Sequence, residues 1–322
     1  MALSSPPKRD IWFRNRLLRD AIGQAIYDEM KVGPNIHLFG EGAHMKVHFD
    51  APQIEADFSE RIHTMPISED GNMNFAVGAS LAGVKPVVDV IAGDFFYRCM
   101  DSIANTAAKL NAMRPGEEPR TIVIRGEVMI GGPTTGQRPE AIFAHMPGVN
   151  VMLPSTPRDA YRMMREALNN PGVTVFFEDR MVKDSDVKND DAWDVPQHEP
   201  ALRRYKSRAA LTIASYGVCR QIVENALDRY DLRAINVFDL MYLYPLGDLW
   251  PLVEDTRNLL IVEPDIVYGG IGAEIVAKVA ERFPGAIVKR LGAPRETITA
   301  NYDDHYKYLP SEEEVIRATR SF

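Results

Sequence analysis

The feature of this sequence that most constrains its fold is the alternation of amphipathic helices with short apolar strands. Apolar side chains recur at helical spacing between Asn15 and Met30, and a turn at 33–35 separates that helix from an apolar strand at 36–40. The same order of helix and strand returns along both halves of the chain. Because strands that are apolar throughout need cover on both faces, the pattern predicts an α/β fold with mostly parallel sheets.

The first half of the chain continues this alternation. We expect a small-residue helix over 75–81, a turn at 85–86, helices over 99–113 and 157–169, a helical stretch over 139–145, and strands over 87–91, 121–125, 149–153 and 173–178. The helix at Pro157 has the clearest start, because a hydroxyl residue, a proline and an acid occupy its first positions.

An acidic stretch punctuated by prolines interrupts the alternation at 183–204 and predicts a linker. We therefore expect a first α/β domain over 1–185, a linker over 186–205 and a second α/β domain over 206–322. In the second domain we expect strands over 211–214, 234–238 and 259–263, and helices over 221–230 and 271–283. A length of 322 residues suits two domains of roughly 150 residues each.

Charge and cysteine content exclude several classes of function. The chain has 37 Lys and Arg against 45 Asp and Glu, and this net charge of −8 argues against nucleic-acid binding through a basic face. Cys99 and Cys219 are too few for a disulfide framework or a multi-cysteine zinc site. The first residues lack the apolar core of a signal peptide, and no stretch approaches the roughly 20 apolar residues that span a bilayer. We therefore expect a cytoplasmic protein with neither a nucleic-acid nor a membrane partner.

Two short patterns each allow a binding site or a purely structural interpretation. The glycines of 269–272 follow a strand and open a helix, which suits either an anion site on helix-terminal amides or close packing of helix and strand. We favour close packing, because the GxGxxG spacing and the P-loop lysine are both missing. His44 and His48 are four residues apart, yet no HExxH motif or third acidic ligand accompanies them. We expect a solvated pair there and no metal site in this chain.

Two neighbouring segments carry a family resemblance. The run Met-Pro-Ile-Ser-Glu at 65–69, followed by Ala-Val-Gly-Ala-Ser-Leu-Ala-Gly-Val-Lys-Pro-Val-Val at 76–88, resembles the β subunit of the thiamine-diphosphate-dependent decarboxylating component of 2-oxo-acid dehydrogenase complexes. Further segments match this family in order and spacing, at 143–148, 153–157, 175–178, 261–263 and 270–275. The resemblance covers residues 15 to 310 and implies a pyrimidine-binding domain followed by a transketolase-type C-terminal domain.

The resemblance implies roles for two residues of the first domain. Glu69 corresponds to the catalytic glutamate, whose carboxyl group hydrogen-bonds the cofactor pyrimidine and favours the tautomer that removes the thiazolium proton. We expect burial against the small-residue helix to raise its pKa. Taken alone, an acid near a helix N-terminus would be explained by the helix dipole. Phe95 corresponds to an aromatic that stacks on the pyrimidine, although a core phenylalanine at a strand end is the alternative.

One departure from the family lies in the glycine-rich loop before Glu140. The family carries a histidine there, and alignment on Gln137 and Glu140 puts Thr135 in its place. A threonine hydroxyl can donate a hydrogen bond but does not titrate near neutral pH. Arg138 is an added cation close by, and it either holds an anionic group of the substrate or is a solvated surface arginine, which we favour. Thr135 and Arg138 are therefore the substrate-side candidates.

The resemblance also implies partners, because the family binds the diphosphate and Mg²⁺ through a GDG-to-Asn motif on a separate chain or domain. Here Gly93-Asp94 is followed by Phe95 instead. We expect an α subunit that carries this motif, an α2β2 heterotetramer with a shared active site, and possible transfer to a lipoyl acyltransferase. The alternatives are the C-terminal half of a split transketolase-like enzyme that moves a two-carbon ketol unit, and a non-catalytic structural subunit. The sequence does not identify the substrate.

Overall fold

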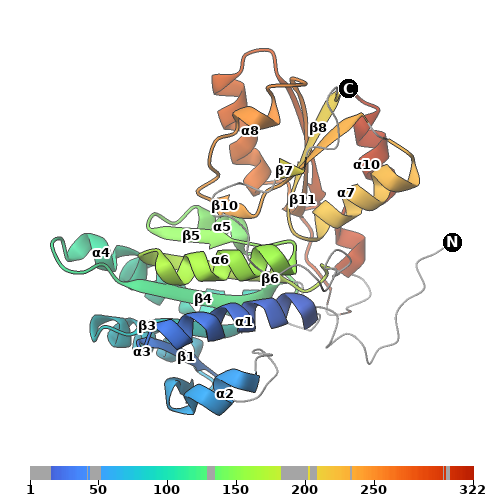
Figure 1. The fold of residues 1–322 in the computed structure, drawn as a ribbon. Helices are drawn as coiled ribbons and strands as arrows, with labels where there is room; N and C mark the ends of the chain where they lie inside the picture. Colours follow the sequence, from blue (N-terminus) through green and yellow to red (C-terminus); the bar gives the residue numbers. More distant parts are fainter. Residues whose placement is uncertain are drawn as a thin grey trace.

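The chain forms two lobes, each built on its own sheet (Figure 1). The computed structural model describes residues 16–41, 43, 52–128, 135–182, 202–203, 209–232, 234–299, 301 and 305–322. Among them, no helix is both long and apolar enough to cross a membrane. The two-domain α/β fold with mostly parallel sheets is confirmed.

The first lobe contains a seven-stranded sheet in the order β10-β5-β6-β4-β3-β1-β2. Its strands are β1 (Ile36–Gly40), β2 (Ile62–Thr64), β3 (Lys85–Ala92), β4 (Thr121–Val128), β5 (Val149–Met152), β6 (Gly172–Asp179) and β10 (Tyr242–Tyr244). The first six are parallel, and β10 joins β5 in the antiparallel direction. A strand from the second half of the sequence therefore completes the sheet of the first half.

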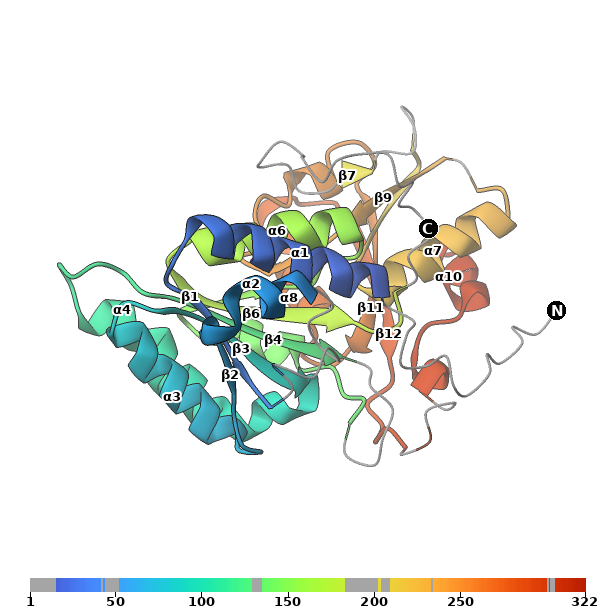
Figure 2. The same cartoon turned by 60° about the horizontal axis from the view of Figure 1, so that its bottom comes forward.

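Helices cover both faces of this sheet, as Figure 2 shows. The helices α1 (Arg16–Val32) and α6 (Pro157–Asn169) pack together over one face, where they enclose Val87 and Val123. The helix α3 (Glu69–Leu81) and the segment after β3 cover Val88 and Val90 on the opposite face. Alternate residues of the strands thus lie in two separate cores, which explains why the strands are apolar throughout. The remaining helices of the lobe are α2 (Pro52–Phe58), α4 (Leu110–Met113) and α5 (Glu140–Ala144).

The start of α6 confirms the capping pattern predicted from the sequence. The Thr156 side chain accepts a hydrogen bond from the Asp159 amide at 3.1 Å, and Pro157 is the first helical residue. The cap satisfies an amide that would otherwise lack a partner at the helix end. It also fixes the direction in which the chain leaves β5.

The second lobe contains a five-stranded sheet in the order β12-β11-β8-β9-β7. Its strands are β7 (Leu202–Arg203), β8 (Leu211–Ser215), β9 (Ile235–Asp239), β11 (Asn258–Ile266) and β12 (Ile287–Ala293). Its helices are α7 (Val218–Arg229), α8 (Ile271–Arg282) and α10 (Glu312–Thr319). Helices α7 and α10 pack on one face and α8 on the other, so this sheet is also covered on both sides. The short β7 is antiparallel to β9 and lies within the stretch that we predicted to be a linker.

Two local predictions were wrong. The residues Lys85-Pro86 belong to β3 and not to a turn, because Gly83, with a φ of 91°, makes the turn before them and Pro86 lies at the strand start, where proline is tolerated. The segment 99–113 is not one α-helix. A π-helix at Ser102–Thr106 is followed by a 3₁₀ turn at Ala107–Lys109 before α4 begins.

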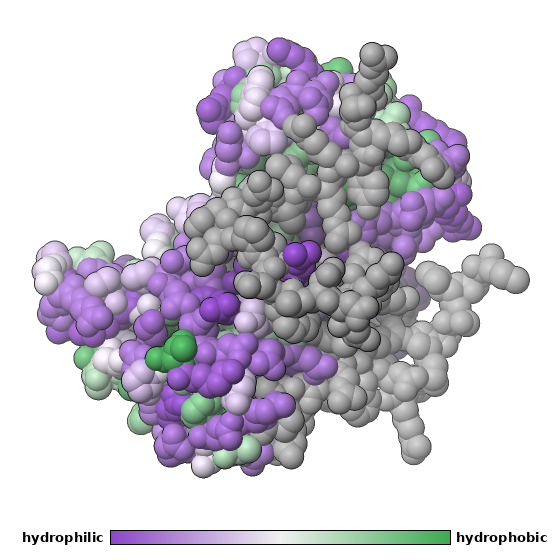
Figure 3. Space-filling model, in the orientation of Figure 1, coloured by the Kyte–Doolittle hydropathy of each residue, from purple (hydrophilic) through white to green (hydrophobic). Residues whose placement is uncertain are grey.

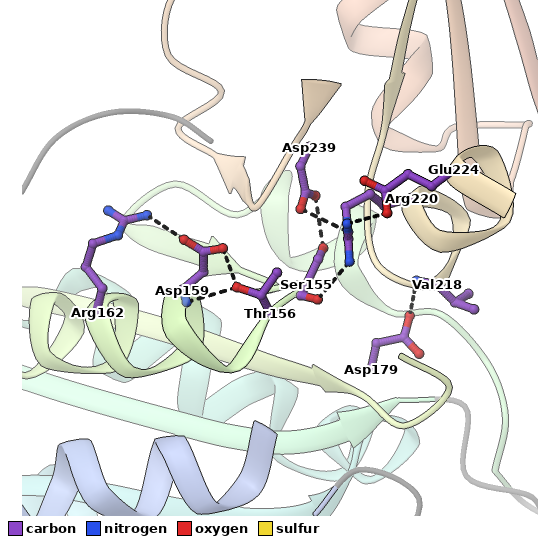
Figure 4. Close-up of polar contacts among 9 residues, drawn as sticks. All are labelled: Ser155, Thr156, Asp159, Arg162, Asp179, Val218, Arg220, Glu224 and Asp239. Atoms are coloured by element: carbon purple, nitrogen blue, oxygen red, sulfur yellow. Dashed lines mark hydrogen bonds and ion pairs between the residues drawn. The ribbon is translucent and has the colours of Figure 1, made fainter. Parts of the chain in front are cut away.

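A polar seam joins the lobes, drawn in Figure 4. Ser155, three residues after the end of β5, donates a hydrogen bond at 2.9 Å to Asp239 at the end of β9. Arg220 in α7 approaches Asp239 at 3.4 Å and also bonds Glu224 at 2.7 Å. Burial raises the pKa of Asp239 to about 7, and the Arg220 guanidinium opposes that rise.

The described residues on the face drawn in Figure 3 are largely hydrophilic, and the apolar residues of both lobes lie mainly inside.

The two glycines that precede β3 and β5 give a matched test of close packing. Gly83 and Gly148 have φ values of 91° and 87°, but a Cβ at Gly83 would meet nothing within 4 Å, whereas one at Gly148 would lie 2.3 Å from the Ala108 carbonyl oxygen. We expect Gly83→Ala to lower the free energy of unfolding by about 1 kcal/mol. Gly148→Ala should lower it by about 1–3 kcal/mol more, measured by urea unfolding. Equal losses in both variants would contradict the close approach of the broken helix to β5.

Candidate active site

The candidate site lies at the edge of the first sheet where its parallel strands end. Glu41 follows β1, the segment 65–69 joins β2 to α3, and Phe95 follows β3. The register pairs Gly40 of β1 with Thr64 of β2, so the ends of these two strands lie side by side. Helix α3 packs against the segment of Phe95. The carboxyl edge of a parallel sheet is where open α/β folds commonly bind ligands.

Glu69 is the first residue of α3, so the helix begins six residues earlier than its small-residue stretch predicted. The Met65 amide donates a hydrogen bond to the Gly40 carbonyl at 3.0 Å, which holds the segment leading to Glu69 against the end of β1. The Glu69 side chain is half-buried. A carboxylate at this position also benefits from the helix dipole. Glu69 therefore lies at the start of α3, at the carboxyl edge of the sheet, with part of its surface exposed.

Glu41 is a second carboxylate of this edge that the sequence analysis missed. Burial raises its pKa, and the negative charge of nearby Glu69 raises it further, while a hydrogen bond from the Ser68 backbone opposes the rise. Two carboxyl groups that interact in this way favour the retention of a proton between them. Its position directly after the apolar strand β1 is the signal that would have identified it.

Phe95 lies in a 3₁₀ helix, Gly93–Cys99, at the end of β3. It is half-buried, whereas the adjacent Phe96 is fully buried, with its ring 5.1 Å from that of Phe177. Of the two neighbouring phenylalanines, Phe96 therefore belongs to the core and Phe95 keeps part of its surface exposed. The core interpretation offered for Phe95 fits Phe96 better.

Asp94 connects this segment to the loop of the substrate-side candidates. Its carboxylate accepts hydrogen bonds from the Gly136 amide at 2.9 Å and the Gln137 amide at 3.2 Å. Burial raises the pKa of Asp94, and these amides oppose the rise. The contact brings half-buried Thr135 close to Phe95 in space. Residues 131–134 of the glycine-rich loop lie outside the described residues.

The expectation that Arg138 is a solvated surface residue was wrong, because its side chain is only 3% exposed. Its guanidinium lies 2.8 Å from the Glu140 carboxylate and 2.9 Å from the Asp179 carboxylate. The two carboxylates raise the pKa of Arg138 above its usual value in spite of burial. Its positive charge is therefore already compensated within the protein.

A cavity of about 620 Å³ lies between the two lobes beside this loop. Residues of both lobes line it, among them Tyr97, Thr135, Arg138, Asp265, Tyr268 and Arg295. Burial raises the pKa of both Asp265 and Glu140, and Asp265 raises that of Glu140 further, while the Arg138 guanidinium opposes both rises. Thr135 and Arg138 thus face a space that the second lobe helps to form, which no local sequence pattern indicated.

The glycine turn before α8 serves close packing, and the backbone amide at the start of α8 already donates its hydrogen bond to a side chain of this chain. The Gly272 amide donates a hydrogen bond at 2.9 Å to the carboxylate of Glu263 in β11, which is fully buried. A Cβ at Gly270 or Gly272 would lie within 2.7 Å of that carboxylate. An internal carboxylate therefore occupies the place that an external anion would take.

Among the residues that the structure describes, no three His, Cys, Asp or Glu side chains lie close enough together to hold a metal ion. His44 and His48 lie outside the described residues. Cys99 and Cys219 are both buried and free.

Comparisons with known proteins agree on the family of both lobes. The model for the transketolase pyrimidine binding domain matches residues 15–183, and the model for the transketolase C-terminal domain matches 201–315. The chain is 28% identical over 323 residues to the 2-oxoisovalerate dehydrogenase subunit beta 2, mitochondrial, of Arabidopsis thaliana, covering 94% of this chain and 88% of that protein. It is 30% identical over 284 residues to the pyruvate dehydrogenase E1 component subunit beta of Gracilaria tenuistipitata var. liui, covering 83% and 85%. A solved structure described as a split gene transketolase, inactive beta4 tetramer, superposes with a TM-score of 0.77 at 20% identity over 94% of this chain and 97% of that one.

The buried carboxylates beside the cavity predict a particular dependence of stability on pH. Burial raises the pKa of Asp265 from its unfolded value of about 4 to about 7 in the folded protein. The stability that the protonated Asp265 carboxyl contributes is therefore fully present below about pH 4 and is lost as the pH rises to about 7. We expect Asp265→Asn to reduce the loss of unfolding free energy between pH 5 and pH 7.5 by about 1–2 kcal/mol. Urea unfolding at both pH values measures this.

The control for this test is Asp228→Asn, which changes an exposed aspartate of α7 in the same lobe. It should follow the wild-type pH dependence. A wild-type pH dependence in Asp265→Asn as well would mean that this carboxyl is ionised in the folded protein throughout the range.

Proposed function

The chain belongs to the transketolase-like family that includes the β subunits of 2-oxo-acid dehydrogenases, and from this premise we propose that it is the β subunit of a thiamine-diphosphate-dependent enzyme. The enzyme would decarboxylate a 2-oxo acid and transfer the acyl or aldehyde unit. The observation that carries the proposal is the position of Glu69, a half-buried carboxyl at the carboxyl edge of the sheet beside a second carboxyl, Glu41. Such a pair can keep a proton where a cofactor nitrogen needs one.

The residues at this edge fit the pyrimidine half of the cofactor. Glu69 would hydrogen-bond a ring nitrogen, and the exposed part of Phe95 would stack on the ring. Glu41 would lie beside Glu69 as a second carboxyl group, whose pKa burial and the negative charge of Glu69 both raise. Bound thiamine diphosphate supplies a carbon nucleophile and an electron sink for decarboxylation. Thr135 would donate a hydrogen bond on the substrate side. Arg138 pairs with two carboxylates and would hold the loop of Thr135 in place, so its effect on the substrate would be indirect.

An α subunit would provide the diphosphate and Mg²⁺ site. Exposed apolar side chains two and six residues along the chain from Glu69 support such a partner, because Ile67 is 85% exposed and Phe75 of α3 is 57% exposed. Exposed apolar groups beside a polar pocket are typical of surfaces that another chain covers. We propose an α2β2 assembly in the cytoplasm, with a lipoyl acyltransferase as the acceptor of the acyl unit.

The proposal predicts that catalytic turnover is lost when the Glu69 carboxyl group is replaced. We expect Glu69→Gln in the complex with the α partner to lower kcat by about 10²–10⁴-fold, because an amide cannot exchange a proton with the pyrimidine. The measurement screens pyruvate, 2-oxoisovalerate and ketose phosphates, with an artificial electron acceptor for oxidative decarboxylation and mass spectrometry for ketol transfer.

The control is Glu274→Gln, which changes an exposed glutamate of α8 that pairs only with Lys278 at 3.5 Å among the contacts described. It should retain wild-type kcat. Ketol transfer without decarboxylation would favour the split-transketolase alternative. Full activity of Glu69→Gln would show that the catalytic assignment is wrong.

A further inference from the structure

We propose that His305 is a positioning residue that clamps the Thr135–Gln137 segment against Asp94. The clamp itself is independent of the proposed function, and only its effect on turnover rests on that function. His305 comes from the second lobe, after β12, and the segment that it contacts belongs to the first lobe. The two meet beside the cavity between the lobes.

The His305 ring lies directly on the backbone of Gly136. A Cβ at Gly136 would fall 2.4 Å from Cε1 of the ring, 3.0 Å from Nδ1 and 3.1 Å from Nε2. Cε1 and the two nitrogens that flank it are therefore the part of the imidazole that occupies the space a side chain at residue 136 would need. His305 is 0% exposed, so the contact is fully enclosed. Only glycine leaves room for the ring at this position, and the φ of 112° at Gly136 also favours glycine.

A hydrogen bond fixes the orientation of the ring. Nε2 of His305 lies 2.9 Å from the carbonyl oxygen of Thr299. Because a carbonyl oxygen only accepts, Nε2 carries the hydrogen. The ring is therefore held by its own lobe while its Cε1 side packs against the loop of the other lobe.

Asp94 holds the same loop by its backbone amides. It accepts hydrogen bonds from the Gly136 and Gln137 amides at 2.9 Å and 3.2 Å. The loop is thus held between a carboxylate bonded to its amides and an imidazole packed on its Cα. Asp94 directly precedes Phe95, so the clamp joins Thr135 to the segment proposed to contact the cofactor.

This arrangement gives His305 a role that its place in the sequence does not suggest. The loop carries no histidine at Thr135, and yet an imidazole from 170 residues further along the chain packs against the next residue. Fixing a loop before the reaction removes part of the entropy cost of ordering it around a substrate. We therefore assign His305 to the order of the loop and not to proton transfer.

The test measures amide hydrogen exchange by mass spectrometry in the full chain, in peptides that contain Gly136 and Gln137. We expect His305→Leu to accelerate exchange of these amides at least tenfold, because leucine cannot bond the Thr299 carbonyl. His305→Gln keeps a donor at the end of the side chain and should stay within threefold of the wild type. Asp94→Asn should accelerate exchange at least tenfold. The double variant Asp94→Asn/His305→Leu should add no more than threefold to either single variant, because both residues act on one loop.

The control is Tyr308→Phe, which removes a hydrogen bond of 2.9 Å to the Thr297 carbonyl in the same segment without touching Gly136. It should leave exchange at Gly136 and Gln137 unchanged. Thermal unfolding monitors the fold of every variant, and the comparison between His305→Gln and His305→Leu remains informative where Asp94→Asn is unstable. Wild-type exchange in His305→Leu, or equal acceleration in His305→Gln and His305→Leu, would overturn the clamp.

Turnover of the most reactive of pyruvate, 2-oxoisovalerate and 2-oxoglutarate gives the functional readout. We expect His305→Leu to lower kcat about tenfold with a change of less than threefold in the KM for thiamine diphosphate, and His305→Gln to restore kcat. Accelerated exchange with wild-type kcat would overturn the positioning role. A failure of the proposed function would appear differently, as full activity of Glu69→Gln with the exchange results unaffected.

Discussion

The buried carboxylate of Asp179 is the interaction on which the arrangement of the two lobes depends. It stands at the end of β6 and accepts hydrogen bonds from Arg138 and from the Val218 amide, both at 2.9 Å, and from the Met181 amide at 3.0 Å. Val218 begins α7 in the second lobe, so one carboxylate joins a strand, a loop and the first turn of a helix from the other lobe. A Cβ at Gly217 would lie 2.5 Å from Asp179 Oδ2, which explains the glycine there.

The cost of burying these charges is offset by the number of donors around them. An isolated buried carboxylate would cost several kcal/mol, and the cost falls only where hydrogen bonds and an opposite charge replace water. Asp179 has an arginine and two backbone amides, and Arg138 has two carboxylates. In the seam between the lobes, Asp239 likewise has a hydrogen-bond donor, Ser155, and a cation, Arg220, beside its carboxylate. Such polar contacts require defined geometry, so they fix the relative position of the lobes and with it the shape of the cavity between them.

The sequence predicted the parts of the fold that local patterns determine. Helix α1, strand β1 and the capped start of α6 follow from periodicity and capping within a few residues. It did not predict β10, because three residues at 242–244 form a strand only where the first sheet offers β5 as a neighbour. The burial of Arg138 was missed for a similar reason. Its partner Asp179 lies 41 residues away, and a cation in a polar loop looks solvated when that partner cannot be seen.

In the candidate site, too, the sequence indicated residues of local motifs but missed residues that only the fold brings together. The motif around Glu69 indicated one carboxyl, whereas Glu41 and Asp94 belong to the site because neighbouring parallel strands end at one edge. His305 is more distant still, since it reaches the loop only through the packing of the second lobe. Residues that follow apolar strands were visible in the sequence, but their order across the sheet was not. Strand order is set by long-range pairing, which a single sequence does not record.

The exposure of Glu69 and its neighbours connects assembly to chemistry in the proposed enzyme. Glu69 is half-buried, and Ile67 and Phe75 of the same segment are largely exposed, so the lone chain leaves the proposed pyrimidine site open to water. Water weakens the interaction between Glu41 and Glu69 and lowers the tendency of the pair to keep a proton. A partner that covers this edge would remove that water and strengthen the electrostatic interaction between the two carboxyl groups. The proposed chemistry would in this way depend on assembly with the partner.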